Sequence, residues 1–167
     1  MKGDGMRISP VNSKLRVRLL TVALLVVLGF VAAGVAGAAR STSSAAVKTR
    51  SLKHLGVVLV NAKGRTLYVF MKDKHSRVTC TGTCAKYWPP LKWKSASRPG
   101  AAGAAKGSLL GLDKDPAGGK VVTYHHWPLY TYTGDSAPGQ ANGQGLNVNG
   151  GKWYVISASG TVVKHKA

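Results

Sequence analysis

Two cysteines, Cys80 and Cys84, lie four positions apart, and the 167-residue chain has no others. When reduced, such a pair supplies soft thiolates, which suit Cu(I), and His125 and His126 are candidates to complete a site. When oxidised, an isolated close pair forms a disulfide, the simpler expectation in an oxidising compartment. Zinc would need four ligands at a tighter, recognisable spacing. We therefore expect a Cys80–Cys84 disulfide without metal or other cofactor, and copper binding is the alternative.

The carboxylates do not form a catalytic arrangement. The chain has five acids, all of them Asp, and no Glu. The closest pair, Asp113 and Asp115, lies in the segment D-K-D-P, which is typical of a turn. No G-x-S-x-G segment that would place a nucleophilic serine on a sharp strand-to-helix turn occurs. The sequence therefore predicts no enzyme activity.

The first 39 residues predict export from the cytoplasm. Residues 1–18 carry five basic side chains and one acid, and residues 19–39 carry no charge. This pattern is typical of a secretory signal, and Ala36-Gly37-Ala38 resembles a signal-peptidase site. The apolar run is also long enough to cross a bilayer, at about 1.5 Å per residue. Residues 1–39 are thus either a signal peptide cleaved after Ala38 or a single-pass anchor with its helix at 19–39. Both place the rest outside the cytoplasm.

The charge of the chain predicts an anionic partner. Lys and Arg number 24 against five acids, which gives a formal net charge of +19. Such a field favours anionic neighbours, among which the membrane or a cell-wall surface is accessible to an exported domain. Nucleic acid is not expected, because the charged part is exported.

The sequence after the apolar run predicts an all-β fold. We expect a small antiparallel domain at 55–166, preceded by the N-terminal hydrophobic helix and a flexible linker at 40–54, because no later stretch has a helical apolar period. A hairpin is predicted from 56–60 and 65–71 around the turn at 61–64. Residues 95–107 look like a surface excursion. Further strands are expected at 109–112, 120–125, 129–133, 153–156 and 161–163.

A repeated pattern predicts two related β units, at about 55–94 and 108–163. The pattern L-Y-x-[F/Y]-x-x-D occurs at Leu67–Asp73 and again at Leu129–Asp135. The aromatic pairs lie on one face of their strands and are expected to be framework. Each Asp follows its strand, where it either organises a loop or belongs to a ligand site. The motif residues are Tyr68, Phe70, Asp73, Tyr130, Tyr132 and Asp135.

These motifs resemble a bacterial family of secreted repeats, often lipoproteins, of unknown function, with the motif Y-x-[FWY]-x-x-D. The resemblance extends to C-x-G-x-C-A at Cys80–Ala85, W-P-P-L at Trp88–Leu91, G-Q-G at Gly143–Gly145 and W-Y-V-I-S at Trp153–Ser157. It implies an extracytoplasmic location and a repeat architecture, and it implies no activity. The chain lacks the lipid-anchoring cysteine, and Gln140 stands where an acid is common, which weakens a calcium site.

Together these features predict an exported cell-envelope protein. We expect a non-enzymatic binding or structural module at the outer face of the membrane, either anchored or secreted. The alternative is an extracytoplasmic redox or copper-handling protein that uses Cys80 and Cys84.

Overall fold

The computed structural model describes residues 45–73 and 77–165. The chain divides into two units, Met1–Arg40 and Ser41–Ala167, and the described residues all belong to the second. The predicted signal or anchor at 1–39, with its helix at 19–39, therefore lies outside them. Within 45–73 and 77–165, no helix combines the length and apolar character needed to span a membrane.

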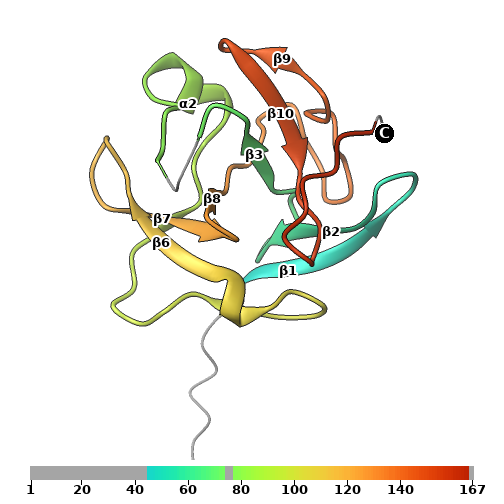
Figure 1. Ribbon diagram of the computed structural model, residues 1–167, viewed down its shortest axis with the longest axis horizontal. Coiled ribbons are helices and arrows are strands. Elements are labelled where there is room, and N and C mark those ends of the chain that lie inside the picture. The colour runs from blue at the N-terminus through green and yellow to red at the C-terminus, as the bar shows by residue number, and fades with distance from the viewer. Residues whose placement is uncertain (1–44, 74–76, 166–167) are drawn as a thin grey trace, which may run out of the picture. The chain divides into compact units, whose positions relative to one another are not determined.

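Short strands make up most of the described chain, with almost no helix. Most of these strands, and the one short α-helix among the described residues, are labelled in Figure 1. The strands are β1 (Ala45–Leu52), β2 (Gly56–Asn61), β3 (Tyr68–Phe70), β4 (Lys92–Trp93), β5 (Gly100–Ala101), β6 (Leu110–Lys114), β7 (Lys120–Tyr124), β8 (Trp127–Pro128), β9 (Asn147–Val148) and β10 (Gly151–Val155). The helical elements are α2 (Thr83–Tyr87) and the 3₁₀ turn η1 (Gly107–Leu109).

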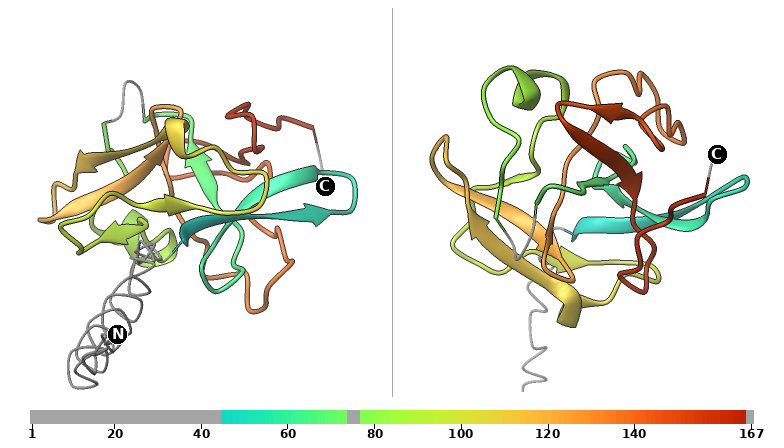
Figure 2. Two further views of the ribbon diagram at one scale, coloured as in Figure 1. Left: turned by 90° about the horizontal axis from the view of Figure 1, so that it is seen from below. Right: turned by 45° about the horizontal axis from the view of Figure 1, so that its top comes forward.

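The strands form three small sheets. Their orders are β2-β1-β5, β3-β10-β9 and β4-β7-β6, and β8 also pairs with β7. All pairings are antiparallel except that of β1 with β5. Figures 1 and 2 show the β1–β2 and β6–β7 hairpins on opposite sides of the domain, with β3 between them. The small antiparallel sheets agree with the predicted all-β class.

The linker predicted at 40–54 is wrong for its second half. Residues Ala45–Leu52 form β1, which pairs with β2 from Val47 opposite Asn61 to Leu52 opposite Gly56. The small and polar residues of β1 carry little strand signal of their own. Burial of Val47 and pairing with the apolar strand β2 decide its conformation. The excursion predicted at 95–107 likewise contains β5, which pairs with β1.

For the hairpin predicted around residues 61–64, the turn is confirmed but the pairing of its two strands is not. The turn forms: the Gly64 N–H donates to the Asn61 carbonyl at 2.9 Å, and the Asn61 side chain accepts from the Arg65 N–H at 3.0 Å. Val60 and Thr66 then make a single bridge. Beyond it the chain turns away, and β3 pairs with β10 instead of β2. Long-range pairing therefore overrides the local hairpin signal.

β3 is covered on both faces, as its sequence predicted. Tyr68 and Phe70 lie in one hydrophobic cluster, and Leu67 and Val69 lie in a second. Each of these side chains is at most 2% exposed. The alternation of a β-strand sends neighbouring side chains to opposite faces, so this short segment is shared by both cores.

The remaining strands follow the sequence in most places. The predicted strands at 109–112, 120–125 and 153–156 correspond to β6, β7 and β10. The return at 161–163 is reduced to a bridge between Ile156 and Val162. The strand predicted at 129–133 is not a ladder either, because only Tyr130 pairs, through isolated bridges to Tyr68 and Pro90.

Candidate functional site

The two copies of the repeated motif meet at their first tyrosines. Tyr68 and Tyr130 form an antiparallel bridge, with the Tyr68 N–H donating to the Tyr130 carbonyl at 2.8 Å and the reverse bond at 3.0 Å. The Tyr68 hydroxyl donates to Oδ2 of Asp135 at 2.7 Å, and the Tyr130 hydroxyl donates to Oδ2 of Asp73 at 2.5 Å. Each tyrosine therefore binds the aspartate of the other repeat, and the two units interlock.

The same aspartates also bind the loops that follow them. Oδ1 of Asp73 accepts from the Thr79 N–H at 2.8 Å and from the Thr79 hydroxyl at 2.6 Å. Oδ1 of Asp135 accepts from the Asn142 N–H at 2.8 Å. Both carboxyl groups are buried, at 0% and 4% exposure. The geometry is that of a loop organiser, and all four carboxyl oxygens have partners.

Burial changes the proton affinity of this centre. Desolvation raises the pKa of Asp73 and of Asp135, while the hydrogen bonds that they accept act in the opposite direction. Desolvation also raises the pKa of Tyr68 and of Tyr130 far above the ordinary value, and the neighbouring aspartates add to the rise. The tyrosines therefore stay protonated and remain donors, which suits a structural link and not a nucleophile.

Four aromatic rings form a continuous stack beside the centre. Phe70 stacks on Trp153 at 4.2 Å between ring centroids, Trp153 on Trp88 at 3.9 Å, and Trp88 on Tyr132 at 4.2 Å. The second aromatic of each motif, Phe70 or Tyr132, forms one end of the stack. The stack is therefore built from both repeats.

The two tryptophans in the middle of the stack were not assigned a role from the sequence. The motif tyrosines stand edge-on to them, Tyr68 against Trp88 at 5.4 Å and Tyr130 against Trp153 at 5.2 Å. Edge-on contacts of this kind contribute about 0.5–1.5 kcal/mol beyond area burial. The W-P-P-L and W-Y-V-I-S motifs could have indicated this role from the sequence, because each contains one of these tryptophans.

The G-Q-G segment also has a structural role that the sequence did not assign. The Gly143 N–H donates to the Tyr68 hydroxyl at 3.2 Å, and a Cβ at Gly143 would lie 2.7 Å from the Trp88 ring. Only a glycine lets the backbone approach the stack this closely. The Gln144 side chain accepts from the Val155 N–H at 2.8 Å and ties the loop to β10.

The predicted disulfide is present between Cys80 and Cys84, whose Cα atoms lie 5.3 Å apart. Cys84 lies in α2, and its carbonyl accepts from the Trp88 N–H at 2.9 Å. The disulfide thus pins the short helix that leads into Trp88. With both sulfurs in the bond, neither is a thiolate ligand in this state.

His125 and His126 form the turn between β7 and β8, both at positive φ, 47° and 67°. Nδ1 of His125 lies 3.1 Å from the Gly160 carbonyl oxygen. Residues 45–73 and 77–165 contain no group of three or more His, Cys, Asp or Glu side chains that could hold a metal ion. The structure therefore does not bring the two histidines and the cysteine pair together as a site.

A family model described as a secreted repeat of unknown function matches residues 49–92 and 111–157, more than half of the chain. The chain belongs to this family. The two matched segments correspond to the two interlocked units, although each begins or ends a few residues away from the predicted limits. A secreted repeat is extracytoplasmic, in agreement with the predicted export. Neither the curated proteins nor the solved structures gave a match.

The exposed charge in the described part of this secreted repeat is almost entirely positive. Asp73, Asp115 and Asp135 are buried, so among the acids in the described part of the chain only Asp113 is partly exposed. Asp115 is also paired with the Lys92 ammonium, the one salt bridge within the described ranges. Apart from Lys92, the basic side chains of the described residues are thus left without a salt bridge to neutralise them.

Proposed function

We propose that this secreted repeat is a non-enzymatic binding module at the outer face of the membrane, held there by an anionic surface. The observation that carries the proposal is the burial of three aspartates, Asp73, Asp115 and Asp135, in a chain of formal net charge +19. Since almost no exposed acid screens the Lys and Arg side chains, their fields add over the surface.

The energetics favour a membrane or envelope surface as the partner. A Lys or Arg near a lipid leaflet of negative charge contributes about 1 kcal/mol to binding. Two or three such contacts would therefore raise the affinity by more than about tenfold. No pocket chemistry is needed for this attraction.

The aspartates support a role without catalysis. Asp73 and Asp135 each accept hydrogen bonds from a tyrosine and from a loop, and Asp115 is paired with Lys92. A general base needs a lone pair that can reach a substrate. These groups are instead committed to holding the fold.

The test is sedimentation with vesicles that differ only in headgroup charge. The protein purified from the envelope of its producing cells is mixed at low salt with phosphatidylglycerol vesicles or with phosphatidylcholine vesicles. We expect retention on the anionic vesicles at least about tenfold above that on the zwitterionic ones. Equal retention on both, or none on either, would overturn the proposal.

Membrane attachment through residues 19–39 stays a prediction. The intact mass of the same envelope protein distinguishes cleavage after Ala38 from retention of the segment. No observation favours the redox or copper-handling alternative, which would require reduction of the Cys80–Cys84 bond.

A further inference from the structure

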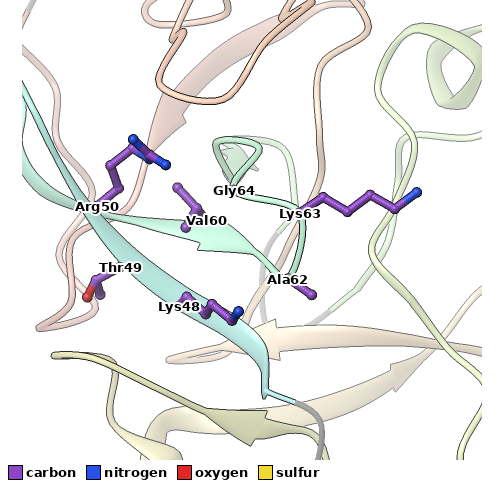
Figure 3. A pocket seen from close by; sticks show the side chains of 7 residues that line it. All are labelled: Lys48, Thr49, Arg50, Val60, Ala62, Lys63 and Gly64. Carbon is purple, nitrogen blue, oxygen red and sulfur yellow. The ribbon is translucent and has the colours of Figure 1, made fainter.

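A hollow of about 320 Å³ opens on the β1–β2 hairpin. It is lined by residues of β1, by Val60 of β2 and by the turn that follows β2, and no acid is among them (Figure 3). The lining residues are Lys48, Thr49, Arg50, Val60, Ala62, Lys63 and Gly64. The volume suits one small chemical group and its carrier, and not a long stretch of polymer.

The cations of this hollow are arranged by the strand. Lys48 and Arg50 are two positions apart on β1, so their side chains leave the same face, while the Thr49 hydroxyl on the opposite face accepts from the Ala104 N–H at 3.0 Å. Figure 3 shows both cations beside the turn that carries Lys63, whose side chain extends away from β1. Two cations therefore belong to the hollow itself, and the third lies at its edge.

The Arg50 guanidinium lies close to two loops. A Cβ at Gly64 would lie 3.5 Å from one of its nitrogens, and a Cβ at Gly139 would lie 4.0 Å from the other. Gly64 has φ of 78° in the turn set by Asn61, so the approach of its backbone is fixed by that turn. The planar fork of Arg50 thus has a defined place beside the hollow.

Within the part of the chain that the structure describes, these cations have no ion-pair partner. Among residues 45–73 and 77–165 no salt bridge involves Lys48, Arg50 or Lys63, and their charged groups make no hydrogen bond. Bringing like charges together in one hollow is unfavourable without a counter-charge. An anion with several oxygens would supply that counter-charge.

We propose, resting on the binding function proposed above, that this hollow binds the phosphate group of a phosphate ester. Arginine pairs with phosphate oxygens through two parallel N–H donors, and lysine adds a point charge. A phosphate group, whether in a monoester or a diester, keeps at least two unesterified oxygens that can accept from the Arg50 fork, while its negative charge attracts the Lys48 ammonium. The ester comes either from a lipid headgroup or from a soluble molecule.

The first measurement titrates the envelope-purified protein with glycerol 3-phosphate and follows backbone amides by NMR. We expect saturable shifts at Thr49, Lys63 and Gly64. The variant Lys48→Gln/Arg50→Gln should bind at least about tenfold more weakly, because each removed donor contacted a charged group. The control Lys94→Gln/Arg98→Gln removes the same charge from exposed positions outside the hollow and should stay within about twofold.

A second variant separates recognition from bulk charge. Arg50→Lys keeps the net charge and loses the bidentate fork, so glycerol 3-phosphate should bind severalfold more weakly. An unchanged thermal midpoint shows that the variant is folded. Equal binding by wild type, Arg50→Lys and both double variants would overturn the proposed hollow.

Vesicles distinguish the source of the phosphate and the two proposals. If retention on phosphatidylglycerol vesicles drops in Lys48→Gln/Arg50→Gln but not in Lys94→Gln/Arg98→Gln, the lipid headgroup is the source of the phosphate. If Lys48→Gln/Arg50→Gln loses affinity for glycerol 3-phosphate but not retention on vesicles, the source is a soluble ester. If both double variants lose vesicle retention equally and no hollow amide shifts, the hollow is wrong and the general anionic attraction stands. If wild type does not prefer anionic vesicles, the proposed binding to an anionic surface is wrong. The glycerol 3-phosphate titration then decides by itself whether the hollow binds phosphate.

Discussion

At the scale of single residues, the molecule is organised by two tyrosines and two aspartates that exchange partners between repeats. Tyr68 binds Asp135, and Tyr130 binds Asp73. Removing one hydroxyl leaves a buried carboxyl oxygen without its donor, and such an unsatisfied group costs about 1–3 kcal/mol. The contribution of each tyrosine to stability should therefore greatly exceed that of an ordinary surface tyrosine.

We expect Tyr68→Phe to lower the free energy of unfolding by about 2–3 kcal/mol, since the hydroxyl serves both Asp135 and the Gly143 N–H. Tyr130→Phe should give a similar loss through Asp73. Urea unfolding followed by tryptophan fluorescence measures both. Tyr87, which is 58% exposed, supplies the control Tyr87→Phe, with little change expected. A loss below about 0.5 kcal/mol for Tyr68→Phe would contradict the interlocked centre.

The raised pKa of Asp73 gives a signed pH dependence. Burial raises this pKa above the ordinary value of 3.8, so the folded state holds the proton more tightly than the unfolded state. The resulting stability is fully present below the unfolded pKa and is lost as the pH rises through the folded pKa. Wild type should therefore gain stability relative to Asp73→Asn as the pH falls.

The measurement is the difference in unfolding free energy between wild type and Asp73→Asn at several pH values from 7 to 3. Using the difference removes the charge effects that both proteins share. Asp113→Asn, at a partly exposed carboxylate, controls for the loss of one negative charge. A difference that stays flat or falls toward low pH would show that the Asp73 pKa is not raised.

At the scale of elements, the motif positions were predictable and the pairings were not. The alternation of Leu67, Tyr68, Val69 and Phe70 predicted a strand buried on both faces, because period-2 patterning is local information. The partner of that strand, β10, lies more than eighty residues away in sequence, and no local sequence pattern predicts this pairing. β1 was missed for the same reason, since its small residues become a strand only against β2.

The β7–β8 turn favours glycine at one position over other small residues. His126 has φ of 67°, a conformation that costs a side chain about 1–2 kcal/mol and costs glycine nothing sterically. His126→Gly should be more stable than His126→Ala by about 0.5–1 kcal/mol after the entropy of glycine is counted, since both variants lose the imidazole. His126→Ala keeps the steric cost and should not gain. A His126→Gly variant no more stable than His126→Ala in thermal denaturation would contradict this account of the turn.

The disulfide makes a prediction about α2. Alkylation of the native protein should label no thiol, and alkylation after denaturation with reductant should label both cysteines. Reduction should lower the unfolding free energy by about 2 kcal/mol, because the bond closes a very short loop. Cys80→Ser/Cys84→Ser, which has no bond to reduce, should not respond to reductant. Two labelled thiols in the native protein would favour the redox and copper alternative.

At the scale of the whole molecule, charge and burial act together. The excess of Lys and Arg follows directly from the composition of the sequence. The sequence did not predict that Asp73, Asp115 and Asp135 are buried, because burial depends on the tertiary contacts of each side chain. The same limit hid the hollow, in which Arg50 meets Gly64 and Gly139 from two other segments.

The central claim is that exposed positive charge holds this secreted repeat to an anionic surface. The most direct test measures the affinity for phosphatidylglycerol vesicles as the salt concentration is raised from about 10 to 500 mM, where the Debye length shortens from about 30 Å to under 5 Å. The account predicts an affinity that falls steeply and continuously with salt. An affinity that does not change with salt would contradict it, because apolar contact and not charge would then hold the protein to the surface.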